Sequence, residues 1–512
     1  MSVLLENPSM FGYCYTQLTD TFQERNGVYR FDRSQKVDAA RLRQIQSRPA
    51  AYEHGASAAR VRLTNSPTAL PVASALKSLG RVDDIDQLGA NGPLDASAGQ
   101  DSLFNCLFGR DSMRMALDLL DDFPVVARAT LLELARLQGV RFNPRGEEEP
   151  GRILHEHREL GDPIRERLGI HWDFPYYGAM DSTPLWISLL GAYCSRWEPS
   201  FLAERMTDRL GRDVSIADCL IAAAARTLQF LEGPVAGYAS SRRATPHSLV
   251  NQSWTDSWDA FYYEDGTLFD ADESRVAVEV QGNMYDALMA AASLLEGLLV
   301  GTESFRSDDL RHAADELRMR LLRDFWLDDA GMFATAATGR AGGSLRVSRV
   351  IGSNPGRLLA SGILDGPELK SIRERLVARL LAPDMLAAAG IRTKSVDSPR
   401  FHAGSYHNGS TWPVDTGIIS DGMRRAGFPR EADDLDERII QACLAVGGFP
   451  EFFRGDADGA IGVNTQVLDV TEPSGQVNRL EQPPQLVQGW TVTRAWRILR
   501  RRGAIGPPGR LN

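Results

Sequence analysis

Apolar residues recur every three or four positions through most of the chain from Phe104 to Trp496, which is the spacing of amphipathic α-helices. The loops between these segments are rich in Gly, Pro, Asn, Asp and aromatic residues. Alternating strand patterns are too few for a large sheet. The pattern therefore predicts an all-α protein with helices over 112–120, 125–137, 182–193, 217–231, 278–299, 310–325, 368–381, 416–425, 431–446 and 487–498.

Helices joined by long loops can close into a toroid of helical hairpins or stack into an open solenoid. A solenoid normally has a short repeat period, and this sequence shows none. Helix starts are indicated by Asp111, which can cap a helix from Ser112, and by Pro184 and Pro413 in first turns. Because a polar and aromatic loop precedes each start, we expect these loops to converge on one pocket.

The first hundred residues differ from the rest. Residues 1 to about 48 alternate aromatic, polar and basic residues, and the following stretch to Gln100 is rich in Ala, Ser, Gly, Asn and Asp. We expect residues 1–100 to form a loop-rich arm with short strands, packed on a catalytic domain of residues 101–512.

Charge and cysteine content exclude several kinds of protein. The chain has 512 residues and a formal charge of −10 that is not gathered into long runs, which argues against a nucleic-acid or anionic-membrane partner. Five scattered cysteines suggest neither a disulfide framework nor a zinc site. The N-terminus lacks a signal-peptide pattern and no apolar run is long enough to span a bilayer, so we expect a soluble cytoplasmic protein. The oligomeric state is not indicated.

The stretch 251–259 combines two indoles, Trp254 and Trp258, with two carboxylates, Asp256 and Asp259. Indole faces and carboxylates together suit a ligand with C–H faces and hydroxyl edges, which is a sugar. Asp256 has two interpretations. It could cap a helix from Ser257, with both tryptophans packed on one side, or it could be a general acid whose pKa is raised by burial against the indoles.

A second carboxylate, Glu451, lies between aromatic residues after the irregular segment Gly447 to Pro450. It could be a solvated loop residue or the partner of Asp256. Glycoside hydrolysis needs two such groups, an acid that protonates the leaving oxygen and a base or nucleophile across the sugar ring. Only a closed fold could bring these distant residues together.

The histidines indicate little metal chemistry. His155 and His157 have a spacing that places both on one face of a strand, but no third ligand is evident, so we predict no metal and no cofactor. His407 lies among Tyr406, Asn408 and Trp412, which are suited to binding sugar hydroxyls. Serine-nucleophile and phosphate-binding motifs are absent.

Motifs along the chain resemble the amylo-α-1,6-glucosidase family, which is the glucosidase half of glycogen debranching enzymes, together with related helical-toroid glucosidases and mannosyl- or glucosylglycerate hydrolases. The matching motifs are FGRDS (108–112), EPGRILHE (149–156), PYYGAMDSTPL (175–185), NQSWTDS (251–257), VEVQG (278–282), SNPG (353–356), YHNGSTWPVD (406–415) and FPE (449–451).

The resemblance implies an (α/α)6 toroid that hydrolyses a terminal α-glycosidic bond with inversion and without a metal. Asp256 matches the general acid and Glu451 the general base. Arg110 and Asp111 match the pair that grips hydroxyls of the terminal sugar. The other expected substrate-binding residues are Tyr177, Asp181, Trp254, Asp259, Gln281, His407, Trp412 and Trp490, with Asp259 as a hydroxyl ligand or a structural partner.

Three departures from the family pattern narrow the expected substrate. Thr255 stands where the family often has lysine, Trp490 is displaced from the family's C-terminal Pro-Gln-Ala-Trp-Ala position, and the first hundred residues leave no room for a large β-domain. These differences point away from branch-point glycogen and toward a small or terminal α-glucoside.

Two other functions stay open. A compatible-solute hydrolase that cleaves glucosyl- or mannosylglycerate would need a cation near the aglycone carboxylate, and the sequence offers Arg141, Arg145 and Arg454. A sugar-binding protein that has lost turnover is suggested by Thr255. Each possibility has a small carbohydrate as its partner.

Overall fold

The computed structural model describes residues 30, 34–38, 40–42, 70–99, 103–159, 161–167, 170–235, 237–298, 305–339, 345–463, 466–471, 477–482 and 485–506. Contacts divide the chain into two units, Met1–Thr68 and Ala69–Asn512. In the first unit, the Asp38 carboxylate accepts hydrogen bonds from the backbone of Ala40 and Arg41 at the start of a helical turn. Most of the strands expected in this region fall outside the described residues, and its packing as an arm stays a prediction.

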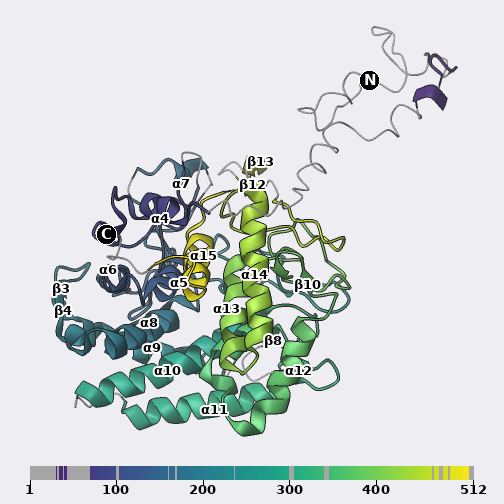
Figure 1. Cartoon of the computed structure of the whole chain (residues 1–512). Helices are drawn as coiled ribbons and strands as arrows, with labels where there is room; N and C mark the ends of the chain where they lie inside the picture. The colour runs from purple at the N-terminus through teal and green to yellow at the C-terminus, as the bar shows by residue number, and fades with distance from the viewer. Residues whose placement is uncertain are drawn as a thin grey trace. The chain divides into compact units, whose positions relative to one another are not determined.

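The second unit is built from α-helices, which confirms the all-α prediction (Figure 1). Each of the predicted helical segments is present. The helices are α4 (Val72–Gly80), α5 (Gly109–Leu119), α6 (Pro124–Arg136), α7 (Ile164–Arg167), α8 (Ser182–Arg196), α9 (Ile216–Leu231), α10 (Val278–Leu298), α11 (Ser307–Phe325), α12 (Lys370–Leu380), α13 (Pro413–Arg425), α14 (Pro429–Val446) and α15 (Gly489–Arg501).

The helices of this unit form an (α/α)6 toroid. Contacts between neighbouring elements run around an inner ring of α5, α8, α10, the 3₁₀ helix η3 (Asn354–Ala360), α13 and α15, and α15 closes the ring on α5. An outer helix packs on each inner element, namely α6, α9, α11, α12, α14 and α4 in the same order. The outer helix on α15 thus comes from the first hundred residues.

Short antiparallel strands lie in the segments that connect the helices. The pairs are β1 (Leu107–Phe108) with β2 (Glu156–His157), β3 (Arg205–Thr207) with β4 (Asp213–Ser215), β6 (Trp326–Leu327) with β7 (Met332–Phe333), β10 (Leu386–Ala387) with β11 (Gly390–Ile391), and β12 (Gln466–Thr471) with β13 (Val477–Gln482). A three-stranded sheet joins β5 (Ser274–Ala277), β8 (Ala336–Gly339) and β9 (Arg346–Val347). None of the described helices is long and apolar enough to cross a membrane.

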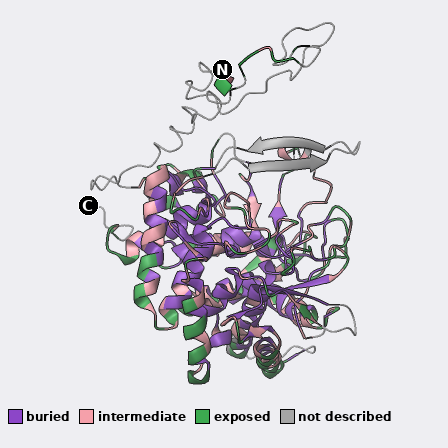
Figure 2. Ribbon diagram, turned by 90° about the vertical axis from the view of Figure 1, so that its right-hand side faces the viewer, coloured by how far each residue is buried: buried purple, intermediate pink, exposed green. Residues whose placement is uncertain are grey.

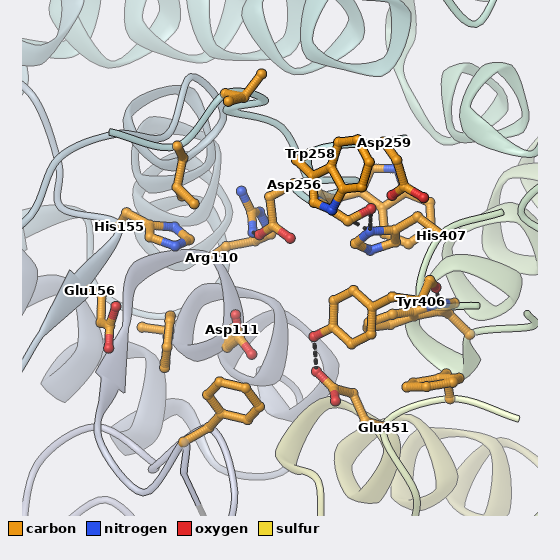
Figure 3. A pocket seen from close by; sticks show the side chains of 18 of the residues that line it. Arg110, Asp111, His155, Glu156, Asp256, Trp258, Asp259, Tyr406, His407 and Glu451 are labelled. Atoms are coloured by element: carbon orange, nitrogen blue, oxygen red, sulfur yellow. Dashed lines mark hydrogen bonds and ion pairs between the residues drawn. The ribbon is translucent and has the colours of Figure 1, made fainter. Parts of the chain in front are cut away.

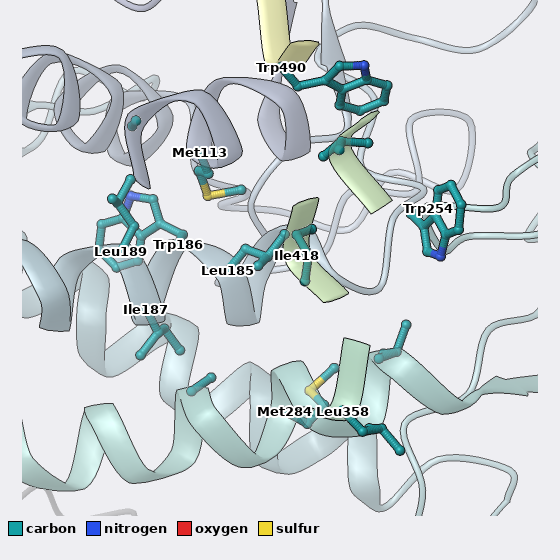
Figure 4. Close-up of a cluster of buried hydrophobic side chains, with 14 of the residues drawn as sticks. Met113, Leu185, Trp186, Ile187, Leu189, Trp254, Met284, Leu358, Ile418 and Trp490 are labelled. Carbon is teal, nitrogen blue, oxygen red and sulfur yellow. The ribbon is translucent and has the colours of Figure 1, made fainter. Parts of the chain in front are cut away.

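The core lies where the inner helices face one another (Figure 2). Side chains from different inner elements meet there, including Met113 of α5, Trp186 of α8, Met284 of α10, Leu358 of η3 and Ile418 of α13 (Figure 4). These buried side chains meet inside the ring, so its centre is a packed core and not a channel. Burying a Met, Leu or Ile side chain of this kind contributes roughly 1.5–3 kcal/mol. Cys106, Cys194, Cys219 and Cys443 are buried free thiols.

The start of α5 corrects one prediction. The helix begins at Gly109 and not at Ser112, so Asp111 lies inside the first turn and does not cap it. Gly109 permits the earlier start because a Cβ there would collide with the carbonyl oxygen of Leu154. Asp111 therefore projects from a regular turn, while Pro184 and Pro413 lie in first turns as predicted.

Candidate active site

A cavity of about 840 Å³ opens at the end of the toroid where α5 and α13 begin (Figure 3). Its wall comes from the start of α5, the segment 254–259, the segment before α13 and the segment after α14. The loops before α5 and α13 thus converge as predicted. The third loop, 175–178 before α8, does not line the cavity.

Asp256 lies on an irregular segment, because 251–259 forms turns and bends and no helix starts at Ser257. The helix-cap interpretation is therefore wrong. Its carboxylate lies 3.4 Å from Nη1 of Arg110. Burial raises the pKa of Asp256 to about 6, and the positive charge of Arg110 opposes this rise. The carboxyl can thus hold a proton just below neutral pH.

Arg110 is fixed in place by partners behind the cavity wall. Its guanidinium makes two bonds to the carboxylate of Asp181, at 2.6 and 3.1 Å, and donates to the carbonyl oxygen of Ser253 at 2.9 Å. The bond to Ser253 also anchors the segment that carries Asp256. A bidentate pair of this kind holds the guanidinium plane rigidly beside the acid.

Asp111 follows Arg110 on the same helical turn and faces the cavity (Figure 3). Its side chain is buried, and burial raises its pKa to about 8 against the opposing charge of Arg110. The nearby carboxylates of Glu451 and Asp256 raise it further. A protonated carboxyl can donate a hydrogen bond to a sugar hydroxyl as well as accept one.

Glu451 reaches the cavity from the segment after α14. This helix ends at Val446, and the φ of 69° at the next residue, Gly447, turns the chain back toward the ring. Only 5% of Glu451 is exposed, so it is not a solvated loop residue. The hydroxyl of Tyr406 donates to Oε1 of Glu451 at 2.6 Å. Figure 3 shows Glu451 and Asp256 on opposite sides of the cavity.

An aromatic wall lies beside these carboxylates. The rings of His407 and Trp412 stack at 4.9 Å, and Phe452 also stacks on Trp412, at 5.2 Å. Trp254 meets both His407 and Trp412 edge-on. Burial lowers the pKa of His407 well below its usual value, so the ring is neutral. The wall is therefore a neutral, closely packed aromatic surface beside the carboxylates.

A buried ion pair supports Trp254 from behind. The guanidinium of Arg357 lies 4.0 Å from the centre of the indole and pairs with Asp415 at 2.6 Å. The arginine is thus held over the ring face, where a cation is attracted by the π electrons. Since Trp254 is two residues before Asp256, this contact restrains the segment that carries the acid.

Nine of the expected site residues line the cavity, namely Arg110, Asp111, Trp254, Asp256, Asp259, His407, Trp412, Glu451 and Trp490. Tyr177, Asp181 and Gln281 do not. Tyr177 donates to the carbonyl oxygen of Leu137, Gln281 exchanges hydrogen bonds with the backbone of Ala239, and Asp181 binds Arg110. Their polar atoms are used inside the protein, which leaves them behind the wall.

Asp259 has a structural partner in addition to its place on the cavity wall. Its carboxylate accepts a hydrogen bond of 3.0 Å from the side-chain amide of Asn408, and its carbonyl oxygen accepts a second one. The segment carrying Asp256 is thereby tied to the segment before α13.

Several lining residues were not singled out from the sequence. Glu156 belongs to a quoted motif and Arg158 lies two residues after it, so the motif could have identified both. Trp172 and Gln488 lie outside those motifs. The arginines expected to meet an aglycone carboxylate, Arg141, Arg145 and Arg454, do not line the cavity and instead pair with Glu148, Asp173 and Asp456. Among the described residues, the arginines that line the cavity are Arg110 and Arg158.

His155 and His157 do not form a metal site. His155 is buried edge-on to Phe108 and Tyr176, and burial lowers its pKa to about 3. Within the part of the chain that the structure describes, no three His, Cys, Asp or Glu side chains are placed to hold a metal ion.

Solved structures with the same fold include several of a mannosylglycerate hydrolase. The GH63 mannosylglycerate hydrolase from Thermus thermophilus in complex with Tris and D-glycerate has a TM-score of 0.56 at 14% identity, covering 83% of this chain and 99% of that one. The same hydrolase with Tris gives 0.55 at 13% identity, covering 84% and 100%. Its complex with glucose gives 0.52 at 13% identity, covering 83% and 98%. No curated protein matches the sequence significantly.

The sequence family that matches this chain is described as the mannosylglycerate hydrolase MGH1-like glycoside hydrolase domain, and the match covers residues 124–466. The expected membership of the (α/α)6 glycoside hydrolases is thus confirmed, whereas the match does not single out amylo-α-1,6-glucosidase. Over most of its length, the chain belongs to the mannosylglycerate hydrolase MGH1-like glycoside hydrolases.

Proposed function

We propose that this protein is an inverting hydrolase of α-glycosylglycerates, with Asp256 as general acid and Glu451 as general base. The observation that supports this most is that both carboxyls line one cavity from separate segments and lie on opposite sides of it (Figure 3). The family match favours a glycosylglycerate over the general α-glucoside that the sequence alone suggested.

In this mechanism, the terminal sugar lies against the aromatic wall with its hydroxyls held by Arg110 and Asp111. Asp256 gives its proton to the glycosidic oxygen, and Glu451 takes a proton from the water that attacks the anomeric carbon from the other side. Inverting enzymes separate their two carboxyls by roughly 6.5–9.5 Å to leave room for that water. Carboxyls on opposite walls of the cavity suit this arrangement.

Arg158 is our candidate contact for the glycerate carboxylate. It lines the cavity, and Glu156 and Asp162 hold its guanidinium by ion pairs. Its Nη2 also donates to the carbonyl oxygen of Leu103. A planar guanidinium held in a fixed orientation on the cavity wall matches the flat geometry of a carboxylate.

A neutral α-glucoside is the second candidate, because acidic side chains outnumber arginines along the described cavity wall. Such a wall disfavours a negatively charged aglycone. A binding protein without turnover has less support. Thr255, which suggested it, is buried against Ser253 and Asn354 and does not line the cavity, whereas the two proposed catalytic carboxyls do.

Hydrolysis of a matched panel tests the proposal. Mannosylglycerate and glucosylglycerate are compared with maltose and isomaltose, and proton NMR records which anomer forms first. We expect glycosylglycerates to be preferred and the β-anomer to appear first. A preference for the neutral sugars would support the second candidate, and release of the α-anomer would exclude inversion.

Variants of the two carboxyls test their assignment. Asp256→Asn and Glu451→Gln should each lower kcat by about 10²–10⁴-fold with little change in thermal stability. Asp329→Asn, which removes an exposed carboxylate paired with Arg349, is the control and should keep full activity. Wild-type rates in either cavity variant would refute the assignment.

A further inference from the structure

The cavity is larger than one sugar and a glycerate require. Its volume of about 840 Å³ lies in the upper part of the roughly 300–1,000 Å³ that holds drug-sized ligands. A glycosylglycerate is smaller than such ligands, so it leaves part of this space unfilled. The unassigned part of the wall includes two tryptophans, Trp258 and Trp172.

Trp258 differs from the other tryptophans of the cavity wall in its exposure. It is 66% exposed, whereas Trp254 and Trp412 are 2% and 1% exposed and pack against each other. Across the described residues, no hydrogen bond or ring contact of its indole is observed. An apolar side chain of this size that is left open on a cavity wall is a surface for a ligand.

The backbone around Trp258 is nevertheless held firmly. The carbonyl oxygen of Ser257 accepts a hydrogen bond of 2.6 Å from Asn251, and its hydroxyl bonds to His407 at 2.9 Å. On the other side, Asp259 is bound to Asn408. The indole is thus carried on a restrained segment, which lowers the entropy lost when a ligand stacks on it.

Trp172 reaches the same cavity from a different segment. Its ring stacks on Tyr176 at 4.3 Å with an interplanar angle of 16°. Its Nε1 is buried and has no hydrogen-bond partner within the described part of the chain. Because this nitrogen is closed to solvent, Trp172 contributes ring surface to the cavity wall and not a donor.

We propose that Trp258 and Trp172 form a subsite for a pyranose ring in the leaving group. The inference rests on the proposed function, because Asp256 marks the oxygen of the bond that is cleaved and Trp258 follows it by two residues. The indole of Trp258 stacks on the C–H face of that pyranose, and the ring of Trp172, held against Tyr176, adds apolar wall beside it. The substrate class is therefore a glycosylglycerate that carries a further terminal hexose, whose leaving group begins with a pyranose ring.

Three substrates with the same terminal hexose separate this subsite from the catalytic groups. They are the α-glycosyl fluoride, which has no leaving-group ring, the α-glycosylglycerate, and a glycosylglycerate extended by that hexose. The wild type should favour the extended substrate. Trp258→Ala should lower kcat/KM for it by about 10- to 100-fold and leave the fluoride nearly unchanged.

Further variants distinguish stacking from a general structural effect. Trp258→Phe should recover most of the activity on the extended substrate, and Trp172→Ala, which removes the second ring, should give a smaller loss than Trp258→Ala. Trp197→Ala removes an indole that is 48% exposed and does not line the cavity, so it is the matched control. Equal losses by Trp258→Ala on all three substrates, or a wild type indifferent to the extra ring, would overturn the subsite.

Calorimetry keeps the test independent of turnover. In the Glu451→Gln background, the disaccharide that forms the first two rings of the extended substrate should bind at least tenfold more tightly than the monosaccharide. Adding Trp258→Ala should abolish this difference. If the wild type hydrolyses none of the three substrates but this binding difference is seen, the proposed function fails and the subsite stands. Equal binding of both sugars refutes the subsite.

Discussion

The hydroxyl of Tyr406 donates a hydrogen bond of 2.6 Å to Oε1 of Glu451, the proposed base. Tyr406 is packed edge-on against Trp412 and Phe452, which fixes its ring. Burial, followed by the charge of Glu451, raises the pKa of Tyr406 well above 10, so the phenol keeps its proton and stays a donor. The bond sets the orientation of the carboxylate toward the cavity.

Removing this donor should affect the chemical step more than binding. In Tyr406→Phe we expect kcat to fall by about 10- to 100-fold, because a hydrogen bond to a charged group contributes about 1.5–3 kcal/mol, while KM changes little. Steady-state kinetics on the preferred glycoside measure both. Tyr263→Phe, which removes a buried tyrosine–threonine hydrogen bond away from the cavity, should leave kcat unchanged. An unchanged kcat in Tyr406→Phe would exclude this function of the bond.

The protonation of Asp256 predicts a pH profile. Since burial raises its pKa to about 6 and a general acid must be protonated, kcat/KM should decline as the pH rises through about 6. A p-nitrophenyl glycoside needs less help from an acid because its leaving group is already stable as an anion. Its rate should therefore fall less over the same range. If kcat/KM declines equally with rising pH for both substrates, a group other than Asp256 controls the alkaline side of the pH profile.

Much of the ring could be predicted from the sequence, because helix periodicity depends on neighbouring residues. The start of α5 could not, since it depends on Gly109 meeting the backbone of Leu154, which is distant in the chain. The inner position of η3 was also missed, because a segment of 3₁₀ helix has no long amphipathic pattern.

The candidate site could also be predicted only in part from the sequence. Asp256 and Glu451 could be selected from their chemistry and motifs, and the fold brings both to one cavity. Tyr177 and Gln281 occur in the same kind of motif, but their polar atoms bond to backbone groups inside the wall. The exposure of Trp258 could not be foreseen because it depends on which segments pack around the ring. Motifs thus identified the neighbourhood, and tertiary contacts decided which side chains face the cavity.

We expect the buried Asp111 carboxyl to lower the stability of the fold while it supports activity. Burial raises its folded-state pKa to about 8, far above its ordinary 3.8. A group with a raised folded-state pKa contributes its stability fully at low pH, and this contribution is lost as the pH rises toward about 8. At neutral pH the folded protein holds Asp111 protonated, whereas the unfolded chain ionises it, and this difference costs stability. Asparagine carries no charge in either state and avoids that cost.

In Asp111→Asn we expect Tm at neutral pH to rise by about 2–4 °C, with a smaller gain in acid, while kcat/KM falls because the asparagine cannot accept through two oxygens. Differential scanning calorimetry in a pH series measures the stability. Asp421→Asn is the opposite control, because arginines including Arg494 and Arg497 hold the pKa of Asp421 well below its usual range. Its removal should lower Tm at neutral pH, and the gap should close as the pH falls. If Tm of Asp111→Asn lies below that of the wild type at every pH, the Asp111 carboxyl stabilises the fold, and the prediction that it lowers stability is wrong.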